Sequence, residues 1–138
     1  MKNRILMSVL GVLLTVFLIS GAVSYCNHQT ELKRNREYET SLAKALKNSY
    51  KDIKEIQFSD PSYSDKPGGW DVKVQLTFRD GVRLMYRTGH RLGDTVNHDS
   101  IFSGPTLDEE SDKLKSRVGY TENQIKVIYS MKTEVILK

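Results

Sequence analysis

Residues 69–87, GWDVKVQLTFRDGVRLMYR, alternate apolar and polar side chains on both sides of Asp80-Gly81. Such strict alternation is typical of strands that turn one face to the core and the other to solvent. An Asp-Gly pair between two alternating runs is typical of a tight hairpin turn. The stretch therefore predicts two antiparallel strands, and the rest of the chain must cover their apolar face.

The length of the hairpin loop follows from the faces of the two strands. A two-residue loop at Asp80-Gly81 would place the apolar side chains of the two strands on opposite faces of the sheet. A three-residue loop, Arg79–Gly81, pairs Phe78 with Val82 and gathers the apolar side chains on one face. We therefore expect the three-residue loop, with Gly81 in the left-handed backbone conformation that such loops require.

The cover for this apolar face comes from the segment upstream of the hairpin. Residues 29–50 contain no glycine or proline. Apolar side chains recur there at spacings of three and four, which is typical of a helix with one apolar stripe. The stripe consists of Tyr38, Leu42, Ala45, Leu46 and Tyr50. We expect this helix to pack on the sheet rather than to form a coiled coil, because the stripe is short.

Two shorter elements flank the hairpin. Ile53–Phe58 predicts a strand that ends at Asp60-Pro61, before a turn-rich loop. Thr106–Val118 predicts a short helix, because Thr106 and Glu109 fit a capping box and acidic residues precede basic ones along it. Its apolar content is low, so we expect it to pack loosely at an edge of the domain.

The C-terminal region predicts a second hairpin and completes the fold. Ile125–Tyr129 and Glu134–Leu137 form its two strands around Met131-Lys132, and the turn type stays open because the turn lacks glycine. The sequence therefore predicts an α+β fold, in which a long helix packs on an antiparallel sheet of about four or five strands with a minor helix.

An apolar segment near the N-terminus predicts a transmembrane helix. Ile5–Tyr25, ILMSVLGVLLTVFLISGAVSY, contains no charged side chain and follows Lys2 and Arg4. A helix of this length spans roughly 31 Å, close to the hydrocarbon thickness of a bilayer. No helix-breaking residue lies between Gly21 and the helix at 29–50, so the two segments are also compatible with one long helix.

A cleaved signal peptide and a lipoprotein signal are the alternatives to a permanent anchor. The apolar run is longer than a typical signal-peptide core, which favours an uncleaved anchor, although small residues at Ser20–Ala22 and Ala22–Ser24 are compatible with cleavage. Cys26 lies where a lipidated cysteine would lie, but Tyr25 departs from the small residue that a bacterial lipobox has there. Because Cys26 is the only cysteine, the domain contains no internal disulfide.

The basic residues beside the apolar segment predict its orientation. Lys2 and Arg4 lie on the N-terminal side, whereas the other side has no lysine or arginine until Lys33. Because basic flanks stay in the cytoplasm, we expect the N-terminus to be cytoplasmic. The predicted regions are a cytoplasmic tail at 1–4, a transmembrane helix or uncleaved signal anchor at 5–25, and an extracytoplasmic α+β domain at 26–138.

The charge balance argues against a nucleic acid as the main partner. The chain has 21 basic and 17 acidic residues, a net charge of +4. Without Lys2 and Arg4 there remain 19 basic and 17 acidic residues, a net charge of +2. Such a small excess creates no strongly basic surface, so we expect the domain to bind no nucleic acid.

One polar constellation follows the hairpin. His90, Asp94, His98 and Asp99 are residue types that bind metals or transfer protons. However, the spacing of the two histidines matches no helical zinc pattern and the stretch predicts a loop, so we expect a polar connection in which His90 forms hydrogen bonds. The sequence also lacks the common nucleophile, redox and phosphate-loop motifs. We therefore expect no enzymatic activity, no metal and no cofactor.

The outer face of the hairpin is the candidate partner-binding site. In the three-residue register Lys73 lies opposite Arg87, while Arg83 and Met85 share their face and Arg79 lies in the loop. Like charges that face each other are mildly destabilising, so a surface that tolerates them suits an anionic protein, lipid headgroup or cell-envelope polymer. The alternative is a solvated face compensated by Asp71 and neighbouring acidic residues. We call Lys73, Arg79, Arg83, Met85 and Arg87 the basic hairpin face.

Three stretches carry a resemblance to a group of bacterial proteins: MKNR with its apolar run, the passage from Leu46–Tyr50 into Ile53–Phe58, and SDKPGGWDVKVQLTFRDG. In organisation the chain resembles small single-pass membrane-anchored or lipoprotein-like Gram-positive proteins of unknown function, especially streptococcal ones. No single motif is diagnostic. Such groups include accessory proteins of secretion systems and immunity proteins, so the resemblance implies a function of one of these two kinds.

These observations predict a membrane-anchored extracytoplasmic binding or accessory protein of the bacterial cell envelope. A narrower alternative is an immunity protein that neutralises a secreted toxin at the cell surface. A third is a metal-dependent hydrolase built on the histidines and aspartates that follow the hairpin. The sequence leaves open the identity of the ligand and the oligomeric state.

Overall fold

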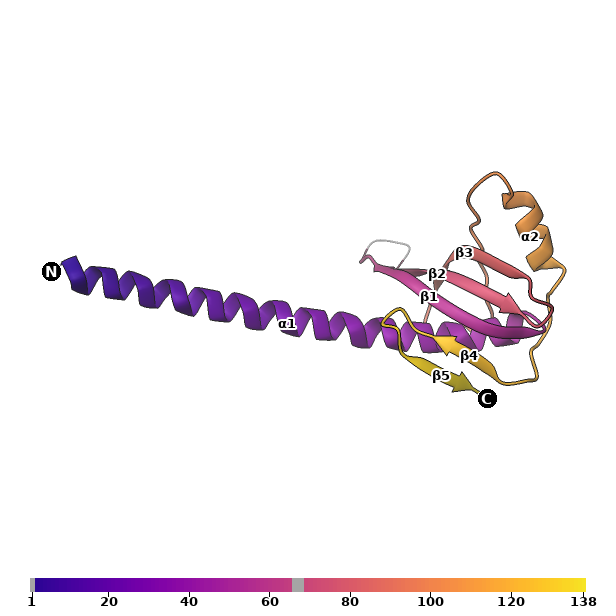
Figure 1. Cartoon of the computed structure of the whole chain (residues 1–138), viewed down its shortest axis with the longest axis horizontal. Helices are drawn as coiled ribbons and strands as arrows, with labels where there is room; N and C mark the ends of the chain where they lie inside the picture. Colours follow the sequence, from indigo (N-terminus) through magenta and orange to yellow (C-terminus); the bar gives the residue numbers. More distant parts are fainter. Residues whose placement is uncertain (1, 66–68) are drawn as a thin grey trace. The chain divides into compact units, whose positions relative to one another are not determined.

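The computed structural model describes residues 2–65 and 69–138 and is drawn in Figure 1. Two helices and five strands make up the described part of the chain. Their order is α1 (Lys2–Ser49), β1 (Ile53–Tyr63), β2 (Trp70–Phe78), β3 (Arg83–His90), α2 (Leu107–Lys115), β4 (Ile125–Ile128) and β5 (Glu134–Leu137). The α+β class predicted from the sequence is confirmed. Part of the predicted turn-rich loop, residues 66–68, lies outside the described residues.

The strands form one sheet in the order β3-β2-β1-β4-β5. Neighbouring strands are antiparallel except β1 and β4, which run parallel with Ile56 opposite Val127. The predicted purely antiparallel sheet is therefore wrong at this one pairing. The chain leaves β3 at one edge, passes through α2 and returns beside β1 in the middle of the sheet, and such a crossover connection permits a parallel neighbour.

The hairpin of β2 and β3 has the predicted register. Val74 lies opposite Tyr86 and Leu76 opposite Leu84, so the apolar side chains share one face. The loop is closed by hydrogen bonds from the Phe78 N–H to the Val82 carbonyl (2.9 Å) and from the Gly81 N–H to the Phe78 carbonyl (3.0 Å). Gly81 has a φ of 87°, so the three-residue loop is confirmed.

The C-terminal hairpin uses the same loop geometry without glycine. The Tyr129 N–H donates to the Thr133 carbonyl (2.9 Å), and the Lys132 N–H donates to the Tyr129 carbonyl (2.8 Å). Lys132 has a φ of 65° and takes the place that Gly81 has in the first hairpin. The turn type that the sequence left open is therefore a three-residue loop with a non-glycine residue in the left-handed conformation.

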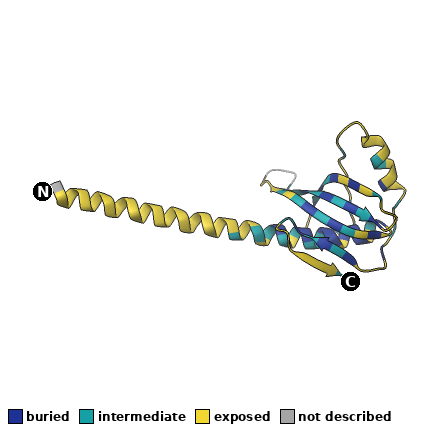
Figure 2. Cartoon of the chain, in the orientation of Figure 1, coloured by how far each residue is buried: buried dark blue, intermediate teal, exposed yellow. Residues whose placement is uncertain are grey.

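The C-terminal part of α1 covers one face of the sheet and forms the core with it. The helix contributes buried residues such as Leu42 and Leu46, and the sheet contributes alternate residues of its strands. Trp70 is fully buried, stacks on Tyr38 with ring centroids 5.0 Å apart, and donates its indole N–H to Asn35 Oδ1 (3.0 Å). Figure 2 shows this burial on the helix and on the strands. The predicted core helix is confirmed, and the indole is anchored at both its ring and its N–H.

Strand β1 is longer than its sequence pattern predicts. It continues through Pro61 to Tyr63, so the prediction that Asp60-Pro61 ends it is wrong. The pairing with β2 shifts register between Ser59 and Ser62, and Asp60 has a φ of 50°. This irregularity accommodates the proline, which lacks a backbone N–H and is tolerated in strands mainly at such bulges and at edges.

Helix α2 lies within the predicted segment but lacks the predicted cap. The Thr106 side chain forms no capping hydrogen bond, so the predicted capping box is wrong. Glu109 instead accepts a hydrogen bond from Lys113 Nζ at 2.5 Å, which lowers the pKa of its carboxyl. Because Lys113 holds the carboxylate along the helix, the carboxylate does not reach back to the N-terminus. Leu114 is the buried residue by which α2 packs on the core.

Helix α1 runs without interruption from Lys2 to Ser49, so the alternative of one long helix is confirmed. Near the N-terminus it is long and apolar enough to cross a membrane, and residues 5–25 are all exposed (Figure 2). The chain divides into two compact units, 1–34 and 35–138. The sheet, α2 and the core therefore belong to the second unit, together with the last turns of α1.

Candidate functional site

The basic hairpin face lies on the side of the sheet opposite the core. Lys73 pairs with Arg87 across β2 and β3, and Gln75 pairs with Met85. These side chains alternate with the buried residues of the same strands. The expected opposition of Lys73 and Arg87 is therefore present, and it brings two cations to one face of the sheet.

Acidic groups compensate these two cations. Arg87 forms an ion pair with Asp71 and donates a hydrogen bond to the Asp60 carbonyl (3.0 Å). Lys73 Nζ lies 3.8 Å from Asp60 Oδ2. Asp71 belongs to the same strand as Lys73, whereas Asp60 is brought beside them by the irregular part of β1. Exposed ion pairs of this kind contribute little stability, but they neutralise most of the charge at this end of the face.

Arg79 does not join the other four residues. It lies between β2 and the hairpin tip, and its Nη2 donates to the Gln124 carbonyl at 3.2 Å, just before β4. Its neighbour Asp80 accepts a hydrogen bond from Arg117 Nη2 at 2.6 Å, and this interaction holds the pKa of the Asp80 carboxyl below its usual range. The charges at the tip therefore connect the hairpin to neighbouring segments.

Arg83 and Met85 remain available on the basic hairpin face. Within residues 2–65 and 69–138, Arg83 forms no ion pair, and its side chain is exposed. Met85 lies two residues further along β3, on the same face, and is 46% exposed. A cation beside an uncovered apolar side chain combines a charge-assisted hydrogen bond with an adaptable apolar contact. The usable part of the predicted site is thus smaller than its five residues.

The polar segment after β3 forms an open cleft of about 370 Å³. Its lining contains the four polar residues that the sequence singled out, His90, Asp94, His98 and Asp99, together with Gly89 and Arg91. His90 is mostly buried, and its Nε2 lies 2.8 Å from Ser41 Oγ on α1. Burial lowers the pKa of His90, while the nearby Asp94 opposes this effect. His90 therefore joins the end of β3 to α1 through a hydrogen bond, as expected.

The loop beyond this cleft is held in place by Asn97. Its side-chain amide donates to the Tyr50 hydroxyl (3.0 Å), and its Oδ1 accepts from Thr88 Oγ1 (2.8 Å). The Asn97 N–H donates to Ser49 Oγ at 2.7 Å. In the described part of the chain, no three His, Cys, Asp or Glu side chains form a group that could hold a metal ion. The geometry thus gives the polar segment a structural function and adds no support to the metal-dependent alternative.

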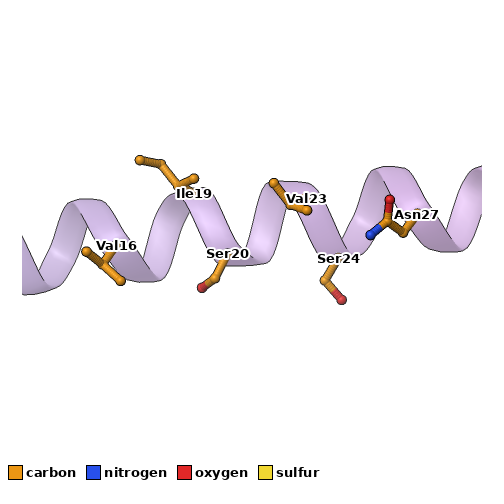
Figure 3. Close-up of a pocket in the computed structure, with 6 residues that line it drawn as sticks. All are labelled: Val16, Ile19, Ser20, Val23, Ser24 and Asn27. Carbon is orange, nitrogen blue, oxygen red and sulfur yellow. The ribbon is translucent and has the colours of Figure 1, made fainter.

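A shallow groove runs along the N-terminal part of α1. Its six lining residues, Val16, Ile19, Ser20, Val23, Ser24 and Asn27, come from successive turns of a single helix (Figure 3). The Ser20 hydroxyl donates to the Phe17 carbonyl at 3.0 Å and so satisfies its hydrogen bond within the helix. A serine bonded in this way is compatible with lipid surroundings. The groove is a surface feature of the candidate membrane segment rather than an enclosed binding site.

Comparison with protein-family models, curated proteins and solved structures finds no match for this chain.

Sequence reasoning missed a buried carboxyl group, Glu39. Its side chain is fully buried, and Oε2 accepts a hydrogen bond from the Ser130 N–H at 3.1 Å. Oε1 has no hydrogen-bond partner among the described residues. Burial raises the pKa of Glu39, against the opposing effects of Ser130 and Arg36. Helical spacing could have indicated that Glu39 is buried. Glu39 lies three residues before Leu42 and seven before Leu46, on the stripe that faces the core.

Proposed function

We propose that this chain is a membrane-anchored binding or accessory protein without enzymatic activity, whose α+β domain contacts its partner through Arg83 and Met85. The observation that carries the proposal is the open sheet face, where an uncompensated guanidinium lies beside an exposed methionine. The residues on this face are anchored to a rigid hairpin. A surface of this kind suits recognition more than chemistry, because it offers no nucleophile or base in a cleft.

The proposed anchor is the apolar segment 5–25 of α1. In this arrangement residues 1–4 lie in the cytoplasm and the domain lies on the outer side of the cell membrane. Lys2 and Arg4 support this orientation through the positive-inside rule. The anchor would hold the domain close to the envelope, where anionic proteins and polymers are available as partners.

The chemistry of the face suggests a protein partner that carries a carboxylate next to an apolar patch. A guanidinium binds a carboxylate through two parallel hydrogen bonds, and a methionine side chain adapts to an irregular apolar surface. A purely anionic polymer would use the arginine but leave Met85 uncovered. We therefore place an acidic protein surface ahead of a polymer.

Site-specific photo-crosslinking in living cells tests this proposal. A photo-reactive amino acid at position 85 of the full chain should give one discrete adduct, whereas the same amino acid at the exposed helix position 44 should not. Arg83→Glu should weaken the adduct at position 85 by about tenfold or more, as expected for the loss of a charge-assisted hydrogen bond. Lys44→Glu makes the same change of charge away from the face and should have no effect.

The identity of the crosslinked protein also separates the two narrower proposals for the function. A secreted toxin in the adduct would identify an immunity protein, and a resident envelope protein would identify an accessory factor. Absence of an adduct at position 85, or an adduct unaffected by Arg83→Glu, would remove this face as the binding site.

A further inference from the structure

The two edges of the sheet differ in how they are protected. At the β3 edge, Arg87 and Ile101 exchange backbone hydrogen bonds of 2.9 and 2.8 Å, so the segment after β3 covers part of that strand. At the other edge, no strand within residues 2–65 and 69–138 pairs with the outer side of β5. An uncovered edge strand is a template for pairing with another chain.

The direction of the backbone groups on β5 follows from the hairpin. Tyr129 and Thr133 form a hydrogen-bonded pair at the loop, and the register continues with Val127 opposite Val135. Because hydrogen-bonded and non-hydrogen-bonded pairs alternate in an antiparallel ladder, Val135 bonds to β4 and its neighbours do not. The N–H and carbonyl groups of Glu134 and Ile136 therefore point outward from the sheet.

The side chains along this edge are apolar and uncovered. Val135 is 39% exposed and Ile136 is 55% exposed. Ile136 lies opposite Lys126 on the open face, whereas Val135 lies opposite Val127 on the core side. A strand added here would therefore cover apolar surface on both faces of the sheet. Residues 134–137 also contain no proline, which often protects natural edges.

We infer that β5 pairs in antiparallel fashion with β5 of a second copy of this chain and joins two five-stranded sheets into one. The register that satisfies the outward backbone groups is centred on Ile136, so that Ile136 pairs with itself. Glu134 then lies opposite Lys138 of the second copy, and Val135 lies opposite Leu137. A two-fold axis makes each of these contacts occur twice.

Charge complementarity selects a second copy as the occupant. The edge reads Glu134-Val-Ile-Leu-Lys138, so reversing it places an acidic residue against a basic one at both ends. Opposite charges facing each other across strands are favourable, and the apolar residues between them meet apolar residues. Glu134 already lies 3.2 Å from Lys126 of its own sheet, so Lys138 of the second copy would extend an existing ion pair.

Cysteine crosslinking of the full chain in its membrane tests the pairing. In the Cys26→Ser background, Ile136→Cys should form a disulfide-linked dimer on mild oxidation, because a hydrogen-bonded antiparallel pair has a Cα separation suited to a disulfide. Met131→Cys is the matched control, since Met131 is comparably exposed on the same hairpin but lies outside the proposed contact. Equal crosslinking at positions 131 and 136 would indicate random collision and overturn the inference.

Charge exchange tests the register independently. In the Ile136→Cys protein, Lys138→Glu should lower the crosslinked fraction several-fold, and adding Glu134→Lys should restore it. Lys44→Glu should leave it unchanged. Failure of the double exchange to restore the dimer would overturn the register.

A proline at the edge separates dimerisation from folding. Ile136→Pro removes an N–H that the monomer does not use, so the protein should lose the dimer by size-exclusion chromatography with light scattering in detergent and keep its unfolding midpoint. An unchanged dimer would overturn the inference. If the midpoint falls, the charge-exchange result decides, because Lys138→Glu leaves the backbone of the sheet intact.

Discussion

Two buried ionisable residues, Glu39 and His90, couple the stability of the domain to pH in opposite directions. Burial favours the neutral form of each side chain, so it raises the pKa of Glu39 above 4.5 and lowers the pKa of His90 below 6.5. Neutral Glu39 is the protonated acid, whereas neutral His90 is the deprotonated base. Acidification therefore favours the folded state through Glu39 and disfavours it through His90.

Glu39→Gln should be neutral or stabilising at pH 7. The folded state resists ionisation of Glu39, so the contribution of this residue to stability is greatest below pH 4.5 and declines as the pH rises through the raised pKa. Glutamine keeps an acceptor for the Ser130 N–H and removes the buried charge, with an expected gain of about 1 kcal/mol or less at pH 7. Chemical denaturation in detergent, followed by the fluorescence of the single tryptophan, measures the effect.

The stability gain from Glu39→Gln should shrink as the pH falls toward 4.5, where Glu39 becomes protonated in both the folded and the unfolded state. A loss of more than about 1 kcal/mol at pH 7 would show instead that the Glu39 carboxylate is needed by Ser130 and Arg36. Glu37→Gln is the matched control, because Glu37 is an exposed residue of the same helix.

His90→Gln should flatten the acid limb of the stability profile. The unfolded chain binds a proton near pH 6.5, whereas folded His90 binds it only at lower pH, so stability is complete above 6.5 and declines as the pH falls below it. In the variant this decline should be weaker. Denaturation of both proteins between pH 7 and pH 5 measures the difference, with His28→Gln as the control because His28 is exposed. Parallel profiles for wild type and His90→Gln would contradict the assignment.

At the scale of elements, the two hairpin loops provide an internal comparison. Both are three-residue loops with a left-handed residue in the third position, glycine at 81 and lysine at 132. Nothing lies within 4 Å of a Cβ added at Gly81, so the effect of a substitution there comes from the backbone alone. Gly81→Ala should lower the unfolding free energy by about 1 kcal/mol, and Gly81→Asn by less, because asparagine tolerates this conformation.

The reciprocal substitution in the second loop should have the opposite tendency. Lys132→Gly relieves a non-glycine left-handed conformation, so we expect unchanged or slightly higher stability despite the greater freedom of glycine in the unfolded chain. Denaturant unfolding of the three variants measures both effects. A destabilisation by Lys132→Gly as large as that by Gly81→Ala would show that the lysine side chain stabilises the loop.

The sequence predicted those elements whose structure depends on local periodicity. Strict alternation located β2 and β3 and even their register, because a shift by one residue would expose every apolar side chain. The path of β1 through Pro61 and its parallel pairing with β4 could not be predicted in this way. The first depends on an irregularity in the pairing of β1 with β2. The second depends on a connection of more than thirty residues between β3 and β4.

The sequence predicted which residues share the candidate site, but only part of how their charges are compensated. Alternation placed Lys73, Arg83, Met85 and Arg87 on one face, as observed. Asp71, which alternation places on the same face, compensates Arg87 through an ion pair. The compensation of Lys73 depends on Asp60, which reaches it from the irregular part of β1. Sequence periodicity therefore indicates the compensation by Asp71, but it carries no information about the compensation by Asp60, which depends on the pairing of β1 with β2.

At the scale of the whole molecule, the apolar helix should keep the chain in the membrane. Residues 5–25 are long enough to span a bilayer and have no packing partner within the described chain. Alkaline carbonate should therefore leave the full chain in the membrane fraction. Replacing Leu13 and Leu14 by aspartate should release it, since each charge near the centre of a helix costs about 2.5–3.5 kcal/mol on insertion. Ser62→Asp and Ser64→Asp together add the same charge outside the segment and should change nothing.

The basic residues beside this helix predict which side of the membrane carries the domain. With Cys26→Ser as background, a cysteine at the exposed position 44 should react with a membrane-impermeant maleimide in intact cells, because the domain is proposed to lie outside. A cysteine at position 3 should react only after permeabilisation. Replacing Lys2 and Arg4 by glutamine should weaken this bias and produce some chains with the reverse labelling, since the basic cluster after residue 32 would then be the stronger one. Labelling of position 3 but not of position 44 in intact cells would place the domain, and with it Arg83 and Met85, in the cytoplasm.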